Sequence, residues 1–214
     1  MSNIVARLAE LKLIPMVVMD NVEHAVELGN ALVVGGLPVA EITFRTSAAE
    51  GAIRALSRRG DLLLGAGTIL SVEQADRAID AGAQFLVSPG TNPVVVEHAV
   101  NHGISIIPGV ATPTEIEFAL SLGVTTLKFF PAENMGGIAT LKALAGPYPD
   151  VRFVPTGGIT PELVPSYLRL RSVIACGGSW LAPRELLAEG RFDAISVLVE
   201  KGRTILSAPP EIAT

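Results

Sequence analysis

The segment LLLGAGTILSVEQADRAIDAGAQFLVS, residues 62–88, contains the repeating unit that decides the fold. It opens with an apolar run at 62–69, continues with a stretch of helical periodicity, and closes with a second apolar run at 84–88. Ser71 is a residue type that caps helix N-termini, and Gln74 stands at the capping-box position, so the middle stretch is predicted to be a helix. Apolar runs without alternation are typical of strands covered on both faces of a parallel sheet. Residues 62–88 therefore predict a strand, a helix and a strand.

The same order recurs along the whole chain. A further helix, roughly Ser2 to Lys12, is expected before the first strand, and Pro161 and Pro183 are expected to open two of the later helices. Strict alternation leaves two architectures, a closed barrel or an open doubly wound sheet. Eight units without a long linker favour an α/β (β/α)8 TIM barrel with an extra N-terminal helix, formed as a single domain by residues 1–214. The expected strands are 14–19, 39–44, 62–69, 84–88, 104–110, 125–130, 152–155 and 172–176.

Composition restricts the classes of partner and compartment. The net charge is −5 and no cluster of Lys and Arg is present, which argues against nucleic acid and favours a small-molecule ligand. Cys176 is the single cysteine and cannot form an intramolecular disulfide, and the chain begins without a basic and then apolar signal segment. No apolar run is long enough to span a bilayer. We therefore expect a cytoplasmic protein without a membrane partner.

Lys128 is an unusual lysine because it lies inside an apolar strand, in TTLKFFP at residues 125–131. Catalytic residues of such barrels lie at the carboxyl ends of the strands. Desolvation inside the barrel would favour the neutral amine, a nucleophile that can form a Schiff base with a ketone. The alternative is a structural lysine whose stem lets the ammonium reach the surface. A lysine between aromatic residues in a strand favours the catalytic interpretation.

Glu41 is the only acidic residue inside an expected strand. A buried carboxylate needs a partner or a task, and the task predicted here is general acid/base catalysis beside Lys128. Arg45 lies four residues later, so a regular strand would point both side chains to the same side, where Arg45 could bind a carboxylate. The alternative is a salt bridge between Glu41 and Arg45 with a structural role only.

Glycine pairs end the last two expected strands, as Gly157-Gly158 and as Gly177-Gly178 followed by Ser179. Glycines permit close backbone approach, and free amides at a helix start bind phosphate oxygens. Many barrels bind phosphate at this place. Sharp turns also need glycine, so each pair alone is a weak signal.

Metal and dinucleotide sites are not expected. His98 and His102 have the spacing of a zinc motif, but no Glu follows the first His, and the segment is typical of a surface helix. Gly65-Ala66-Gly67 lacks the third glycine of a dinucleotide fingerprint.

The chain resembles the 2-keto-3-deoxy-6-phosphogluconate (KDPG) and 4-hydroxy-2-oxoglutarate (KHG) aldolase family over almost its whole length. The resemblance implies a homotrimeric class I aldolase that needs no metal or organic cofactor and acts on a keto-acid sugar phosphate. The blocks that carry it are EITFRT (41–46), GAGT (65–68), SPG (88–90), IPG (107–109), KFFPAE (128–133), PTGG (155–158) and GGSW (177–180).

The resemblance also implies the roles of individual residues. Lys128 would be the Schiff-base residue and Glu41 the general acid/base. Some members carry Arg just after the first strand, where this chain has Met19-Asp20, and this difference bears on substrate preference. The pyruvyl subsite would comprise Arg45, Thr68, Pro89 and Phe130, and the phosphate end would comprise Gly157, Gly158, Gly178 and Ser179.

Two other functions remain open from the sequence. One is another phosphate-binding barrel enzyme, such as an epimerase or a thiamin-phosphate synthase, which would use metal ligands or paired acids instead of Lys128. The other is a sugar-phosphate-binding barrel without catalytic activity. Trapping with borohydride and pyruvate separates both from an aldolase.

Overall fold

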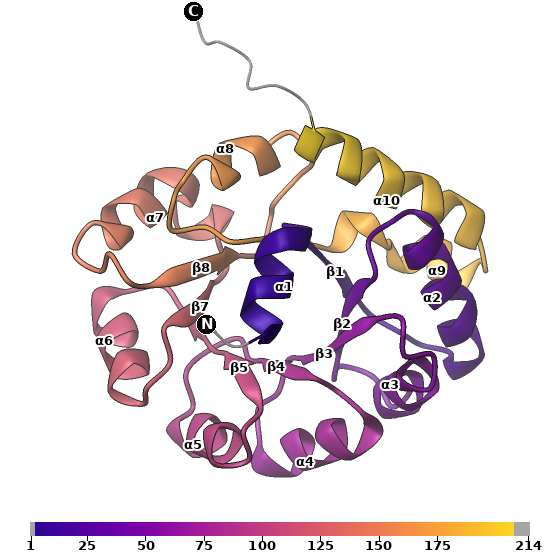
Figure 1. Cartoon of the computed structure of the whole chain (residues 1–214), viewed down its shortest axis with the longest axis horizontal. Coiled ribbons are helices and arrows are strands. Elements are labelled where there is room, and N and C mark those ends of the chain that lie inside the picture. The colour runs from indigo at the N-terminus through magenta and orange to yellow at the C-terminus, as the bar shows by residue number, and fades with distance from the viewer. Residues whose placement is uncertain (1–2, 208–214) are drawn as a thin grey trace, which may run out of the picture.

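Parallel strands surrounded by helices make up the fold in the computed structural model, which describes residues 3–207. Figure 1 shows the strands in a ring with most helices on its outside, and α1 projecting over the centre of the ring. The strands form a six-stranded sheet of order β5-β4-β3-β2-β1-β9 and a three-stranded sheet of order β6-β7-β8. Every strand pairing is parallel, as the apolar runs predict. The chain is thus an α/β protein with a curled parallel sheet.

Strands and helices alternate along the chain after the first helix. The strands are β1 Leu13–Val17, β2 Val39–Thr43, β3 Leu63–Gly67, β4 Phe85–Val87, β5 Ser105–Ile107, β6 Gly109–Val110, β7 Thr126–Phe129, β8 Arg152–Pro155 and β9 Cys176–Gly178. The α-helices are α1 Asn3–Leu11, α2 Ala25–Val34, α3 Ala49–Ser57, α4 Val72–Ala81, α5 Pro93–Asn101, α6 Pro113–Ser121, α7 Gly137–Ala145, α8 Val164–Leu168, α9 Arg184–Ala188 and α10 Phe192–Ser207. The short 3-10 helices are η1 Val22–His24, η2 Glu133–Met135 and η3 Ser179–Leu181.

The unit at residues 62–88 folds as its sequence predicts. All five residues of β3 are buried, which explains the absence of polar alternation. Ser71 caps α4, because its side chain accepts a hydrogen bond from the amide of Gln74 at 3.2 Å. The helix ends at Gly82, whose φ of 104° lies in the left-handed region that favours glycine.

The expected fifth strand is interrupted at Pro108, where β5 ends and β6 begins. Proline has no amide hydrogen to donate to a ladder. Its carbonyl oxygen is still used, since it accepts a hydrogen bond from the amide of Lys128 at 2.8 Å. The chain therefore passes from the larger sheet to the smaller one at this residue.

The eighth expected strand, 172–176, is wrong in its position. Residues 172–175 contribute only one isolated bridge, between Val173 and Phe153, and the strand β9 begins at Cys176 and includes Gly177 and Gly178. Glycine is rare in strands, so the sequence placed the strand end before the pair. A second bridge, between Thr156 and Gly177, links β8 of the small sheet to β9 of the large one.

Two expected helix starts also change. Pro161 lies in a turn, and α8 begins only at Val164. Pro183 precedes the short α9, while the last long helix starts at Phe192. Gly190, with a φ of 68°, separates the two helices. Ser2, the expected start of the first helix, lies outside the described residues.

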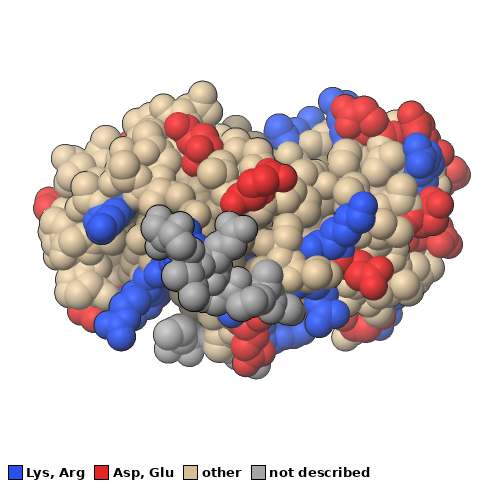
Figure 2. Space-filling view, turned by 90° about the horizontal axis from the view of Figure 1, so that it is seen from above, with Lys and Arg blue, Asp and Glu red and all other residues tan. Residues whose placement is uncertain are grey.

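Charged side chains of both signs occur on the surface. Figure 2 shows acidic and basic residues interspersed over one face of the molecule, most densely on its right half. Within residues 3–207, no helix combines the length and the apolar character needed to cross a bilayer.

Candidate active site

Lys128 and Glu41 form an ion pair in the interior. Each is the third residue of its strand, Lys128 in β7 and Glu41 in β2. Lys128 is 5% exposed and Glu41 is 3% exposed. The Nζ atom of Lys128 donates a hydrogen bond to Oε1 of Glu41 at 3.4 Å. Lys128 therefore does not extend to the surface, and the pair brings a nucleophile and a base together.

Glycines provide the room for this pair. A Cβ atom on Gly67 would lie 2.2 Å from Oε1 of Glu41, so any larger residue at the end of β3 would displace the carboxylate. Gly109 stands in register with Lys128, and a Cβ there would lie 2.0 Å from the carbonyl oxygen of Pro89. Thr68 directly follows Gly67, which packs against Glu41, and the carbonyl oxygen of Pro89 packs against Gly109.

Thr68 has an unusual backbone conformation. Its φ is 60°, in the left-handed region that residues other than glycine rarely adopt. It is the residue directly after β3, next to Gly67 and hence next to Glu41. Lys12 has a similar φ of 61° without any predicted role, so the role of Thr68 stays a prediction.

Arg45 does not pair with Glu41. Strand β2 ends at Thr43, so the alternation that would place both side chains on one side does not extend to Arg45. Its Nε atom donates instead to Oγ1 of Thr43 at 3.3 Å, and the side chain is exposed. The purely structural salt bridge between Glu41 and Arg45 is thus absent from the described chain, and Arg45 remains available to a ligand.

Phe130 connects the lysine to the first glycine pair. Its ring centroid lies 5.2 Å from Nζ of Lys128. A Cβ on Gly157 would lie 3.3 Å from the same ring, and the φ of 102° at Gly157 also favours glycine. The turn after β8 therefore packs against the segment that follows Lys128.

A hollow of about 270 Å³ lies at the carboxyl ends of β1, β8 and β9. A second hollow, of about 450 Å³, shares Met16, Ser179 and Trp180 with it. The first is lined by Met16, Gly157, Gly158, Ile159, Thr160, Pro161, Gly177, Gly178, Ser179 and Trp180. Phosphate groups fit such places, because exposed backbone amides and a hydroxyl can donate to them.

The second hollow is also lined by Arg45, a predicted site residue, and by Arg184 and Glu185, which the sequence did not place there. The guanidinium group of Arg184 holds Asp20 through two hydrogen bonds, of 2.6 and 2.8 Å. The bonded guanidinium lowers the pKa of the Asp20 carboxyl, and the carboxylate in turn raises the pKa of Arg184. Asp20 thus positions an arginine from α9 beside the hollow.

Glu133, which is hydrogen-bonded to Tyr167, contacts the Gly157-Gly158 turn. The hydroxyl of Tyr167 donates a hydrogen bond to Glu133, and the amide of Glu133 donates to the carbonyl oxygen of Gly157 at 3.0 Å. A Cβ on Gly158 would lie 2.8 Å from Cβ of Glu133. Burial, and then the bonded carboxylate, raise the pKa of Tyr167. A tyrosine among apolar helix residues predicts only packing, so this contact could not be predicted from the sequence.

The histidine pair takes part in surface contacts. The Nε2 atom of His98 lies 2.6 Å from a carboxylate oxygen of Asp76, and the ring of His102 packs on that of His98. Among residues 3–207, no three side chains of His, Cys, Asp and Glu gather as a metal ion would require.

The comparisons with known proteins agree on one family. The model of the KDPG and KHG aldolase family matches residues 4–198. The chain belongs to the KDPG and KHG aldolase family. The 2-dehydro-3-deoxy-phosphogluconate aldolase of Treponema pallidum is 50% identical over 202 residues, which cover 94% of this chain and 96% of the relative.

Solved structures of the family superpose closely. The KDPG aldolase of Legionella pneumophila, with pyruvate captured as a covalent carbinolamine, has a TM-score of 0.89 at 38% identity and covers 93% of this chain and 97% of its own. The KDPG aldolase of Zymomonas mobilis with 3-phosphoglycerate has a TM-score of 0.88 at 38% identity and covers 92% and 94%. Both the covalent chemistry and a phosphorylated ligand thus occur in relatives of this chain.

Lys128 and Glu41 lie inside β7 and β2, and the other residues predicted from the family motifs end strands or follow their carboxyl ends. Lys128, Glu41 and Phe130 lie together, and Gly157 contacts Phe130. The predicted residues that line the hollows are Arg45, Gly157, Gly158, Gly178 and Ser179. Met16 and Trp180 were missed, because an apolar residue in a strand and a tryptophan after one indicate packing in the first place.

Proposed function

We propose that this chain is a class I aldolase that cleaves KDPG into pyruvate and glyceraldehyde 3-phosphate through an imine on Lys128. The observation that carries the proposal is the buried pair of Lys128 and Glu41, 3.4 Å apart, in a chain of this family. A sugar-phosphate-binding protein without catalytic activity would have no need for a desolvated amine beside a carboxylate.

Imine formation is the first step of the proposed reaction. Glu41 first takes a proton from the ammonium of Lys128, and the neutral amine then attacks the C2 ketone and gives a carbinolamine. Glu41 takes up and returns the protons, directly or through a water molecule, so that the C2 hydroxyl leaves as water. The 3.4 Å separation allows this exchange without a large movement of either side chain.

Cleavage of the C3–C4 bond follows. Glu41, directly or through a water molecule, takes the proton of the C4 hydroxyl, the protonated imine accepts the C3–C4 bonding electrons, and the aldehyde leaves. Glu41 then returns that proton to C3 of the enamine of pyruvate, and addition of water to the imine releases pyruvate and regenerates Lys128. The imine itself is the electron sink, so this route needs neither a metal ion nor an organic cofactor.

The two ends of the substrate are assigned to two parts of the site. Arg45, Thr68, Pro89 and Phe130 are proposed to hold the pyruvyl half. The phosphate is placed against the hollow of Gly157, Gly158, Gly178 and Ser179, where Arg184 adds a nearby cation. KHG, which would give pyruvate and glyoxylate, is the proposed secondary substrate, and 2-keto-3-deoxy-6-phosphogalactonate is the alternative phosphorylated one.

We further infer that the two sheets form one closed (β/α)8 barrel and one domain over residues 1–214. Two observations support this closure. Pro108 directly connects β5 of the larger sheet to β6 of the smaller one, and isolated bridges join Phe153 to Val173 and Thr156 to Gly177. A homotrimer is proposed because the family resemblance implies it. A cytoplasmic location is proposed because Cys176, the single cysteine, is free and buried.

Trapping with sodium borohydride and pyruvate tests the proposal. Reduction of the imine should inactivate the enzyme and add the mass of the reduced pyruvyl group to the peptide that contains Lys128. The Lys128→Ala variant should lose turnover and labelling, while Lys201→Ala, a change at an exposed residue of α10, should retain both. Label on another lysine would overturn the role of Lys128, and absence of label with retained pyruvate binding would point to a non-catalytic protein.

A further inference from the structure

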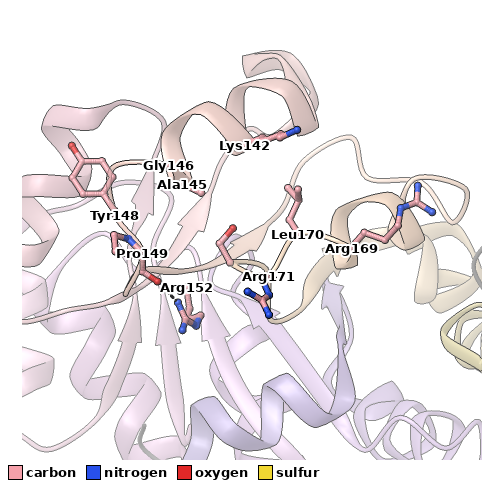
Figure 3. Close-up of a pocket in the computed structure, with 10 residues that line it drawn as sticks. Lys142, Ala145, Gly146, Tyr148, Pro149, Arg152, Arg169, Leu170 and Arg171 are labelled. Carbon is pink, nitrogen blue, oxygen red and sulfur yellow. Dashed lines mark hydrogen bonds between the residues drawn. The ribbon is translucent and has the colours of Figure 1, made fainter.

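A third pocket, distinct from the two hollows near the glycine turns, lies at the amino-terminal end of β8, opposite Gly157 and Gly158. Its volume is about 770 Å³, and it is bounded by the end of α7, the turn that leads into β8, and the segment after α8. Figure 3 shows this pocket with its lining side chains. Its residues are Lys142, Ala145, Gly146, Tyr148, Pro149, Arg152, Arg169, Leu170, Arg171 and Ser172.

Four of the lining residues are cations, and none is an acid. Lys142 comes from α7, Arg152 opens β8, and Arg169 and Arg171 follow α8. This concentration of positive charge occurs in a chain whose net charge is −5. Like charges that share a pocket repel one another, and a bound anion relieves that repulsion.

Within residues 3–207, none of these four cations forms an ion pair with a carboxylate. Arg152 donates to the carbonyl oxygens of Pro149 and Val151, at 2.8 and 3.1 Å. Arg169 donates to the hydroxyl of Ser166 at 2.7 Å. Their positive charge is therefore not neutralised by the protein.

Other surface arginines of this chain behave differently. Arg54 and Arg77 both hold Glu50, and Arg59 holds Asp61, at distances between 2.8 and 3.1 Å. Among residues 3–207, Arg7, Arg45 and Arg58 also lack a carboxylate partner, but they lie in three different parts of the fold, in α1, after β2 and after α3. What distinguishes this pocket is that three such arginines and a lysine line it together, as a binding site for an anion requires.

The arrangement of the side chains favours phosphate. In Figure 3 the guanidinium groups of Arg152 and Arg171 point the same way, Lys142 lies on α7 across the pocket, and Arg169 is directed outward. Two planar guanidinium groups match the oxygens of phosphate groups through paired hydrogen bonds. Lys142, Arg152 and Arg171 together suit a ligand with several negative charges better than a single phosphate.

The remaining lining suits an organic group. Tyr148, Pro149 and Leu170 offer an aromatic ring and apolar surface to the pocket. The hydroxyl of Tyr148 is held by Glu117, to which it donates at 3.0 Å, so the ring has a fixed position. Pockets for small organic ligands have volumes of about 300 to 1,000 Å³, and this pocket falls in that range.

We propose that this pocket binds an organic polyphosphate of the nucleoside triphosphate class. It is separate from the aldolase site, because Arg152 begins β8 while Gly157 lies beyond its carboxyl end. Five residues of extended chain separate the two by roughly 16 Å. A ligand in this pocket therefore does not occupy the position of the substrate.

Calorimetric titration with ATP tests the proposal. The wild-type protein should bind one ATP per chain, and rising salt should weaken the binding because it rests on charge. The variant with Lys142→Gln and Arg171→Gln should have an affinity for ATP that is lower by a factor of about ten or more, since two charged contacts are lost. Neither side chain makes a hydrogen bond within the described chain, so the fold should persist in this variant.

A matched variant controls for net charge. Arg58→Gln with Lys201→Gln removes the same charge from exposed positions elsewhere and should change ATP affinity by about twofold or less. Protein trapped with pyruvate and borohydride should still bind ATP. Absence of ATP binding, equal weakening in both double variants, or loss of binding after trapping would overturn the proposal. A change of oligomeric state in the Lys142 and Arg171 variant would also overturn it, because the cations would then face another copy of the chain.

Discussion

Burial of two ionisable side chains side by side explains much of the chemistry at Lys128 and Glu41. A buried charge is costly unless it is paired, and each of these groups is the partner of the other. The same proximity lets a proton pass between the carboxylate and atoms bound to Nζ. Both residues could be predicted from the sequence, because a charged residue inside an apolar strand is conspicuous.

The change Glu41→Gln should leave the shape of the site nearly intact and remove the proton carrier. General acid/base catalysis contributes about a hundred- to ten-thousand-fold, so kcat should fall by that order. A coupled assay of pyruvate release measures kcat, and circular dichroism reports on folding. The exposed Glu97→Gln variant should keep its turnover. Near-normal turnover of Glu41→Gln would leave Glu41 with only a structural role.

Other site residues could not be predicted, for physical reasons. Arg184 and Asp20 are 164 positions apart, and only the closure of the fold brings them together. Trp180 lines both hollows, and its Nε1 atom is buried without a hydrogen-bond partner among the described residues. No local pattern encodes such contacts, whereas the strand position of Lys128 is local.

Among the elements, strand β9 shows why the eighth strand expected from the sequence was assigned to the wrong residues. Gly177 pairs with Ile14 of β1 on one side and forms the bridge to Thr156 of β8 on the other. The strands approach so closely that a Cβ on Gly177 would lie 2.5 Å from Oγ1 of Thr156. Glycine is needed there for steric reasons, and its low strand propensity concealed the strand. The cap of α4 at Ser71 was predicted correctly, since capping depends on near neighbours only.

Gly177→Ala should therefore destabilise the protein at the join between the two sheets. Overpacking of this kind costs typically about 1 to 3 kcal/mol of the free energy of unfolding. Urea denaturation measures the loss. Gly90→Ala is the matched control, because a Cβ at Gly90 meets no atom within 4 Å, and it should change stability by about 0.5 kcal/mol or less.

A double variant tests the cause of that loss. Thr156→Ala removes the hydroxyl and methyl groups that the new Cβ would meet, so the two changes together should cost less than the sum of the single changes. Strict additivity would show that the clash with Thr156 is not the source of the instability.

For the whole molecule, the order of strands and helices and the end of the sheet that carries the chemistry were predictable, because hydrophobic pattern and fold class determine them. The distribution of charge around that end was not. The sequence indicated a phosphate site of amides and one hydroxyl, but the folded chain brings Arg45 and Arg184 next to it. The hollow proposed for the phosphate thus lies at the ends of β1, β8 and β9, and Lys128, the proposed Schiff-base residue, comes from β7.

Because the phosphate is placed in a hollow apart from Lys128, a change in that hollow should alter substrate preference. Binding of a remote phosphate can raise turnover as well as affinity, so KDPG should have a higher kcat/KM than KHG in the wild type. Ser179→Glu places a negative charge in the hollow and should lower kcat/KM for KDPG about tenfold or more, because like charges repel. Cleavage of KHG, which carries no phosphate, should fall much less.

Ser179→Gln separates charge from bulk, since it adds a side chain of similar size without a charge. It should reduce the preference for KDPG less than Ser179→Glu does, and the difference should shrink at high salt, because salt screens charges at exposed positions such as Ser179. Equal losses for both substrates, or a wild-type enzyme that prefers KHG, would contradict the placement of the phosphate against the glycine hollow. The imine proposed for Lys128 would be unaffected by that result, because it depends on the pyruvyl half that both substrates share.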